Sequence, residues 1–174
     1  MFTFDSMKKL FYIVIFITTT IISIGCGAYS FTGGNTGNAK TIQVDFFPNQ
    51  APLIEPTLSQ KFTLDLQDLF TRQTNLTLVK ANGDLQFSGE ITDYRITPMS
   101  ATANQTAAQN RLTITVNLNF INTLEEKDNF EKRFSFYYDY GATQQLTGGV
   151  LETALNDILE RITQDIFNAS VAKW

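Results

Sequence analysis

The sequence predicts an α+β fold, a two-layer sandwich in which two helices pack on one face of a four-stranded, mainly antiparallel sheet. Three observations carry this prediction. Apolar and polar residues alternate without a break over 111–120, which is the pattern of a half-buried strand. Apolar residues recur at helical spacing over 58–70 and 146–167. The order along the chain is strand, helix, three or four strands, helix, which favours helices gathered on one face of an antiparallel sheet.

A proline-bracketed loop joins the first predicted strand to the first predicted helix. Residues 41–46 alternate between polar and apolar side chains, and Pro48 and Pro52 bracket the loop that follows. From Leu58 to Phe70 the apolar residues form one stripe, with charged and amide side chains opposite. This pattern predicts an amphipathic helix of about four turns.

Two further strands are predicted at 76–79 and 85–96. The dipeptide Asn82-Gly83 between them is typical of a tight turn joining two strands. In the second strand the apolar residues occupy odd positions up to Ile91 and even positions from Tyr94 onward. A β-bulge just after Ile91 would return both sets to the same face of the sheet.

The rest of the domain is predicted as a loop, two strands and a long helix. The segment 98–110 is uncharged and rich in small residues, which is typical of a long loop. The strand at 111–120 and a polar turn follow, and the next strand, 130–138, has its apolar parity interrupted by Lys132. The final helix covers 146–167. Outward positions of the strand at 111–120 are polar and uncharged: Thr113, Thr115, Asn117 and Asn119.

The N-terminal residues have the organisation of a secretory signal peptide. The basic pair Lys8-Lys9 precedes an uncharged apolar run, 10–23, and Gly25 stands directly before Cys26, the single cysteine of the chain. A lone cysteine has no partner for a disulfide within the chain. Its place after the apolar run predicts that Cys26 is a lipid attachment site. The alternative is an uncleaved signal anchor with an incidental cysteine.

The segment Ser23-Ile24-Gly25-Cys26 resembles the lipobox of bacterial lipoproteins, with Ser23 at the position where leucine is usual. We therefore predict a lipoprotein signal peptide at 1–25, a flexible linker at 26–40, rich in glycine and asparagine, and a folded domain at 41–174. Gly27 follows the cysteine in place of aspartate, which by analogy with lipoprotein sorting indicates the outer membrane. The expected location is lipid-anchored on the periplasmic side.

Composition narrows the classes of function. The chain has a formal net charge of -4 and no histidine. Single, scattered basic residues argue against a nucleic-acid partner. The absence of histidine removes the commonest general base, the usual catalytic triads and most zinc sites. The pair Glu125-Glu126 lies in a polar turn, where solvated charge is the ordinary interpretation. We expect no enzyme activity, no cofactor and no metal.

Several long phrases of the sequence resemble the LptE family, and more narrowly a divergent branch of it. They include TIQVDFFPNQAPLIEPTLSQ at 41–60, NGDLQFSGEITDYRITP at 82–98 and DIFNASVAKW at 165–174. The resemblance extends over nearly the whole chain after Cys26. It implies two helices packed on a four-stranded sheet, in agreement with the fold predicted from the residue patterns.

The resemblance also implies a function. Members of this family are outer-membrane lipoproteins that partner the β-barrel LptD in the translocon for lipopolysaccharide. The family member plugs the barrel, assists its assembly and binds lipopolysaccharide. A domain inside a barrel needs an outward surface that is polar without strong charge. The outward face at 113–119 and the uncharged loop 98–110 suit that role, and an ordinary solvated sheet face is the alternative.

Arg95 and Arg111 are the predicted lipopolysaccharide-binding residues. Lipid A phosphates are best bound by arginine or lysine, and these two arginines flank the loop 98–110 near one end of the sheet. Lys132 and Arg133 are expected near the opposite end. The competing interpretation of both arginines is simple ion pairing with nearby carboxylates such as Glu90 or Asp93.

A second class of function is a periplasmic lipid carrier or an envelope scaffold lipoprotein without a barrel partner. Co-purification would separate it from a translocon subunit, because only the subunit brings a large barrel with it. An enzyme is the weakest hypothesis, since it needs a cleft with converging titratable groups.

Overall fold

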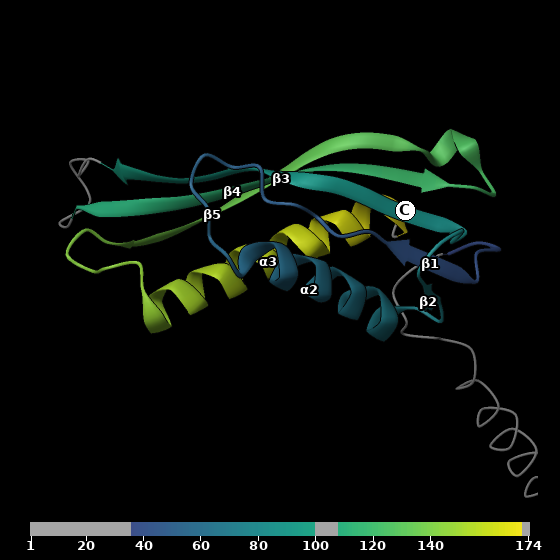
Figure 1. Ribbon diagram of the computed structural model, residues 1–174, viewed down its shortest axis with the longest axis horizontal. Helices are drawn as coiled ribbons and strands as arrows, with labels where there is room; N and C mark the ends of the chain where they lie inside the picture. Colours follow the sequence, from purple (N-terminus) through teal and green to yellow (C-terminus); the bar gives the residue numbers. More distant parts are fainter. Residues whose placement is uncertain (1–35, 100–107, 172–174) are drawn as a thin grey trace, which may run out of the picture. The chain divides into compact units, whose positions relative to one another are not determined.

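The computed structural model of the protein describes residues 36–99 and 108–171. All of them lie in one of the chain's two structural units, Gly33–Trp174. The predicted signal peptide, Cys26, most of the linker, the centre of the loop 98–110 and Trp174 lie outside the described residues. The elements are β1 (Thr41–Val44), α2 (Leu58–Gln73), β2 (Thr77–Val79), β3 (Leu85–Met99), β4 (Gln109–Asn122), the 3-10 turn η1 (Glu126–Asp128), β5 (Phe130–Gly141) and α3 (Gly148–Ser170) (Figure 1).

The sheet has five strands in the order β2-β1-β3-β4-β5. Strands β3, β4 and β5 form the predicted antiparallel meander, but β1 is parallel to both of its neighbours. The α+β class and the two helices are confirmed. The prediction of a four-stranded, mainly antiparallel sheet is wrong in detail, because the sheet is mixed and has one more strand.

The difference arises at Asn82-Gly83, which does not close a hairpin. Ile42 aligns with Leu78 on one side and with Leu85 on the other, so β1 lies between the two strands that flank the turn. Asn82 has the left-handed φ of 54° expected of a tight turn. A side chain at Gly83 would place its Cβ 2.6 Å from the backbone nitrogen of Gln43, so glycine is needed where the turn passes close to β1.

Asp84 joins the start of β1 to the start of β3. Its carboxylate accepts hydrogen bonds from the backbone N–H groups of Lys40 and Thr41, both at 2.9 Å. Its own N–H donates to the Thr41 hydroxyl at 2.9 Å. The bond from the Lys40 N–H above all, then those from the Thr41 side chain and N–H, hold the pKa of the Asp84 carboxyl below its ordinary value. The ionised carboxylate therefore helps to hold β1 in its place between β2 and β3.

The lowered pKa predicts how Asp84→Asn changes the acid sensitivity of the fold. The unfolded carboxyl, with a pKa of about 3.9, binds a proton more readily than the folded one. The carboxylate thus stabilises the protein above that pH, and its contribution is lost as pH falls through the lower folded pKa. We expect the variant to be less stable than wild type at pH 7 and the difference to shrink by pH 3, as measured by urea unfolding. A difference that stays constant with pH would contradict this account.

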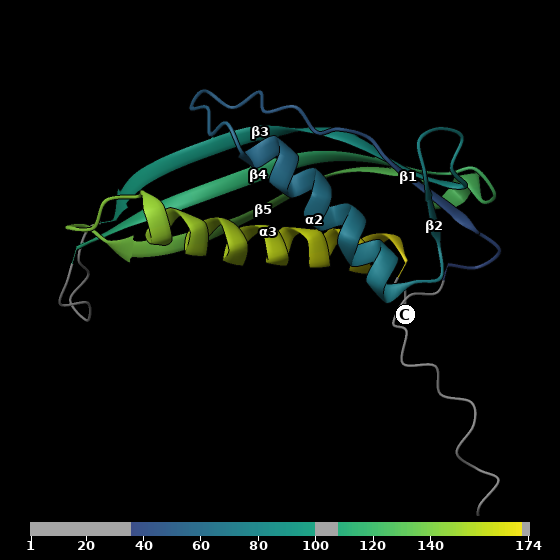
Figure 2. The same ribbon diagram turned by 60° about the horizontal axis from the view of Figure 1, so that its bottom comes forward.

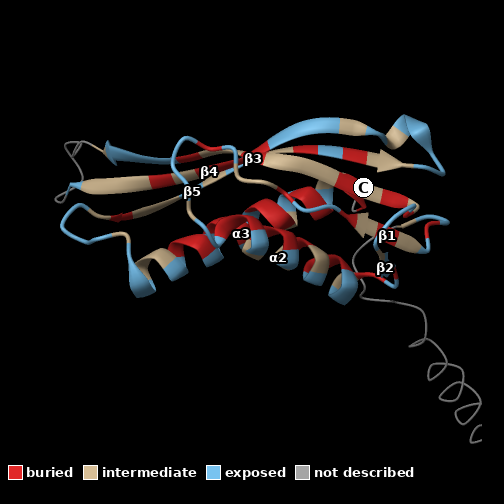
Figure 3. Ribbon diagram, in the orientation of Figure 1, coloured by how far each residue is buried: buried red, intermediate tan, exposed pale blue. Residues whose placement is uncertain are grey.

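Both helices pack on the same face of the sheet, as predicted (Figures 1 and 2). Buried residues line the helix surfaces that face the sheet (Figure 3). Phe70 on α2 links the layers, with its ring centroid 4.7 Å from that of Phe87 on β3 and 5.1 Å from that of Phe167 on α3. The row continues across the sheet from Phe87 to Phe120 at 4.8 Å. Aromatic pairs at these separations add to the free energy gained from burial alone.

The predicted bulge in β3 is present. The register with β4 shifts between Ile91 and Asp93, and Tyr94 is buried beyond it. Ile96, expected on the same inward face, is 40% exposed, since it lies farther along the strand. Both strands extend into the segment predicted as a loop, to Met99 in β3 and from Gln109 in β4.

Candidate functional site

The sheet face opposite the helices carries polar side chains that pair with one another. The hydroxyls of Thr115 on β4 and Ser135 on β5 lie 2.9 Å apart. Two residues farther along β4, the Asn117 amide donates to a carboxylate oxygen of Glu131 at 3.0 Å. Thr113 and Asn119 share this face by the alternation of β4. Neither helix covers it (Figures 1 and 2), so these residues lie on the outward face as predicted, although Thr115 is buried there.

A distal cluster lies on the same face, toward the end of the sheet where β3 ends and β4 begins. We define it as Asp93, Arg95, Arg111, Tyr137 and Asp139. The Arg111 guanidinium donates to both oxygens of the Asp139 carboxylate, at 2.7 and 2.8 Å, and its central carbon lies 3.6 Å from the centre of the Tyr137 ring. The bond to Asp139 is the main cause that raises the pKa of Arg111. Arg95 pairs with Asp93 at 3.2 Å.

The structure brings the two predicted arginines together. Arg95 is opposite Thr113 on β4, and Arg111 precedes Thr113 by two residues. Both arginine side chains are therefore on one face of the sheet, as diagonal neighbours. Such positions are typically about 7–8 Å apart. The two differ in exposure, because the side chain of Arg95 is 61% exposed and that of Arg111 only 29%.

Sequence reasoning missed the partners of Arg111. Asp139 and Tyr137 lie at the odd positions of β5, which alternate with the even positions predicted to face inward. The sequence alone therefore indicated that these two residues face outward. Their pairing depends on the register of β5 against β4, which places Asp139 opposite Arg111. The length of the turn between these strands left that register open.

Lys132 and Arg133 lie away from the distal cluster, as predicted, opposite Leu118 and Asn117 on β4. Lys132 is exposed although it falls on the inward parity of its strand, and its ammonium lies 5.1 Å from the centre of the Phe134 ring. It therefore lies outside the core, at the border of the sheet with α3. Neither cation forms an ion pair with a described residue.

Arg111→Lys tests the geometry of the distal cluster. Lysine keeps the charge but loses the two parallel bonds to Asp139 and the flat contact with Tyr137. Because the pair is only partly buried, we expect a loss of about 1 kcal/mol in the free energy of unfolding. Urea denaturation of Arg111→Lys, Asp139→Asn and the double variant measures the coupling. A loss in the double variant equal to the sum of the two single losses would show that the two residues stabilise the fold independently.

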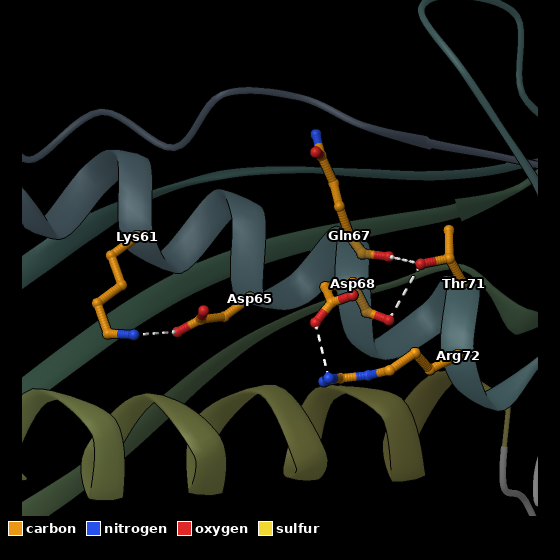
Figure 4. A network of polar contacts seen from close by, with 6 residues as sticks. All are labelled: Lys61, Asp65, Gln67, Asp68, Thr71 and Arg72. Atoms are coloured by element: carbon orange, nitrogen blue, oxygen red, sulfur yellow. Dashed lines mark hydrogen bonds and ion pairs between the residues drawn. The ribbon is translucent and has the colours of Figure 1, made fainter.

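Titratable side chains on α2 form ion pairs along the helix surface (Figure 4). Lys61 pairs with Asp65 at 3.1 Å and Arg72 with Asp68 at 2.9 Å, each one helical turn apart. The Thr71 hydroxyl donates back to carbonyl oxygens of its own helix. Exposed pairs of this kind add a few tenths of a kcal/mol to helix stability. No group of carboxylates, cysteines or histidines in the described part of the chain could hold a metal ion.

The hollows of the described surface have mixed walls of charged, polar and apolar residues. A groove of about 560 Å³ runs between α2 and α3, and its walls include Lys61, Arg72 and Glu160. A second hollow, of about 490 Å³, lies between β5 and α3 beside Lys132 and Arg133. Sites for lipid tails are instead lined mainly by apolar side chains. Charged side chains stand in the walls of both of these grooves.

None of the helices in residues 36–99 and 108–171 is both long and apolar enough to cross a membrane.

Comparison with known proteins gives one family and one fold. A family model described as LptE, lipopolysaccharide-assembly, matches residues 39–170. The hypothetical protein CT253 from Chlamydia trachomatis has a similar structure, with a TM-score of 0.54 at 7% identity over 78% of this chain and 99% of that one. The uncharacterized lipoprotein B from Nitrosomonas europaea has a TM-score of 0.49 at 12% identity, over 82% of this chain and 88% of that one. No curated protein sequence matches the chain. At such low identity the likeness to CT253 shows the fold alone.

Proposed function

Because the chain belongs to the LptE family of lipopolysaccharide-assembly proteins, we propose that it is the outer-membrane lipoprotein subunit of a lipopolysaccharide translocon. In this role it plugs the LptD β-barrel, assists barrel assembly and binds lipopolysaccharide, without catalysis. Residues 1–25 are removed as a signal peptide, and lipid on Cys26 anchors the protein to the periplasmic side of the outer membrane. The family match over most of the chain carries the proposal.

The polar sheet face supports a role inside a barrel. Several of its hydrogen-bonding groups are paired within the chain, as in the Thr115–Ser135 and Arg111–Asp139 contacts. A surface of this kind needs little rearrangement when it moves from water into a polar lumen, because few of its groups lose a partner. The alternative is a lipid carrier without a barrel, and charged side chains in the walls of the α2–α3 groove do not favour it.

For lipopolysaccharide, Arg95 and Arg111 remain the proposed ligands of the lipid A phosphates. Each is already paired with a carboxylate, so a phosphate must compete with Asp93 or Asp139. Arg95 is the more accessible of the two. We expect Arg95→Ala to weaken binding and Asp139→Asn to strengthen it, since the latter leaves the Arg111 guanidinium free for an anion.

The first test is a mild-detergent pull-down of the tagged, lipidated protein from outer membranes, followed by mass spectrometry. Recovery of a stoichiometric large β-barrel would support the proposal. Recovery of the protein alone, or with lipid only, would favour the carrier. Lipopolysaccharide binding is measured on the same preparations, and an affinity that Arg95→Ala and Asp139→Asn leave unchanged would exclude the distal cluster as the binding site.

A further inference from the structure

The described sheet has three open edges, and two of them are protected. β2 is only three residues long. On β5 the residues whose backbone groups point away from β4 include Glu131, Arg133 and Asp139, and charged side chains discourage pairing with another strand. The third open edge is the distal half of β3, which we define as Thr92–Met99. It is longer than β2.

This third edge exists because the chain after β1 follows β3 only part of the way. The Asp45 N–H donates to the Phe87 carbonyl, the Ile91 N–H donates to the Pro48 carbonyl, and the Gln50 N–H donates to the Ile91 carbonyl, at 2.8 to 2.9 Å. Past Gln50 the chain leaves β3 and turns toward α2 (Figures 1 and 2). In the described part of the chain no backbone group pairs with that side of β3 beyond Ile91.

The bulge determines which backbone groups are left at this edge. Ile91 points away from β4 and is opposite Val116, so the next bonded pair is Asp93 with Thr115. Tyr94, Ile96 and Pro98 then direct their backbone groups to the open side. Tyr94 and Ile96 offer both a donor and an acceptor. Pro98 offers only an acceptor, which limits a paired strand to a few residues.

Apolar side chains flank this edge. Ile96 is 40% exposed, and in the loop that leaves β3, Leu53 and Ile54 are 52% and 75% exposed. The loop begins at the strand, where the Gln50 N–H donates to the Ile91 carbonyl at 2.8 Å. In agreement with this, the Glu55 carboxylate contributes to raising the pKa of the Tyr94 hydroxyl, after burial as the larger cause. Backbone groups and apolar side chains thus occur together, which is the combination used in recognition by strand addition.

The charge beside the edge is negative. Asp93 is neutralised by Arg95, but neither Glu55 nor Glu90 forms an ion pair with a described residue. Glu55 accepts only from Thr57, at 2.9 Å from the hydroxyl. A complementary segment would carry a basic side chain at this place.

We propose that the distal edge of β3 binds an extended segment of the barrel partner by strand addition. The segment pairs with the backbone of Tyr94 and Ile96, places apolar side chains against Leu53 and Ile54, and places a basic side chain near Glu55. This inference rests on the proposed function, and it assigns one surface of this chain to the partner.

Hydrogen exchange of individual amides is the direct test, on the full lipidated chain alone and in the barrel complex. We expect the Tyr94 and Ile96 amides to exchange roughly tenfold more slowly in the complex. The Asp93, Arg95 and Thr97 amides, which face β4, serve as the internal control and exchange slowly in both samples. Equally fast exchange of the Tyr94 and Ile96 amides in the complex would overturn the proposal.

A matched pair of charge reversals provides the second test. Glu55→Lys should lower recovery of the barrel in the pull-down about tenfold, whereas Glu126→Lys makes the same change of charge at η1 and should not. Ile54→Asp and its control Leu124→Asp form a second pair. Both leave intact the hydrogen bonds that the Glu55 carboxylate accepts from Thr57. Thermal unfolding verifies that each variant is folded.

The outcomes separate this inference from the function on which it rests. If the wild-type protein is recovered from the pull-down without a barrel, both the proposed function and the docking edge are rejected. A barrel recovered equally with wild type, Glu55→Lys and Ile54→Asp would reject only the edge as the docking site. A cross-link between two copies of this chain at Ile54 in the purified complex would also reject it, because the occupant would then be a second copy.

Discussion

Gly89→Ala is expected to destabilise the domain by about 3 kcal/mol or more, enough to lower the yield of folded protein. Gly89 has a φ of +153°, a conformation that residues with side chains rarely adopt. A Cβ here would overlap the Asn117 carbonyl oxygen on β4 and lie 2.9 Å from the Phe47 ring. Both neighbours are fixed, the first by the sheet and the second by complete burial. The strain therefore has no inexpensive route of relief.

Gly149→Ala is the matched control for this change. Gly149 lies in the first turn of α3, and a Cβ there would meet nothing within 4 Å. Alanine should be neutral or stabilise the helix by up to about 1 kcal/mol. Urea midpoints of the two variants measure the contrast. Similar midpoints for both would mean that β3 shifts away from β4 at Gly89 with little cost.

Phe70→Ala is expected to cost about 3–5 kcal/mol, because the ring is fully buried where α2, α3 and the sheet meet. Its removal leaves a cavity between Phe87 and Phe167, the two rings that it contacts. Neither helix can close that cavity without leaving the sheet. We expect a lower urea midpoint with nearly unchanged slope, as for loss of packing in an otherwise intact fold.

Phe46→Ala provides the comparison within the same residue type. Phe46 is 61% exposed, so the same truncation should change the free energy of unfolding by no more than about 0.5 kcal/mol. A large effect at Phe46 together with a small one at Phe70 would place the core elsewhere.

Much of the fold was predictable because its signals are local. The period of 58–70 and 146–167 located both helices, and the change of parity after Ile91 located the bulge. The place of β1 was not predictable in this way. The Asn82-Gly83 dipeptide indicates a turn but not the partners of the strands beside it. The partners follow from the hydrogen bonds of Asp84, which reach back to Lys40 and Thr41 and are a long-range feature.

The candidate site was predictable in part, for a related reason. The parity of the strands placed Arg95 and Arg111 on one face near one end of the sheet. Their ion pairs required the register between strands, and Asp139 on β5 was therefore missed as a partner of Arg111. The open edge of β3 was not predictable either, since it depends on where the chain after β1 leaves its neighbour.

The position of β1 between β2 and β3 has a consequence for the order of folding. β1 is the first strand of the domain, yet its contact with Asp84 spans 43 residues. Contacts between distant residues form late, because closing a long loop costs entropy before any bond is gained. The hairpins of β3, β4 and β5 need no such closure. We therefore expect a nascent chain to assemble its C-terminal meander first and to insert its N-terminal strand between β2 and β3 last.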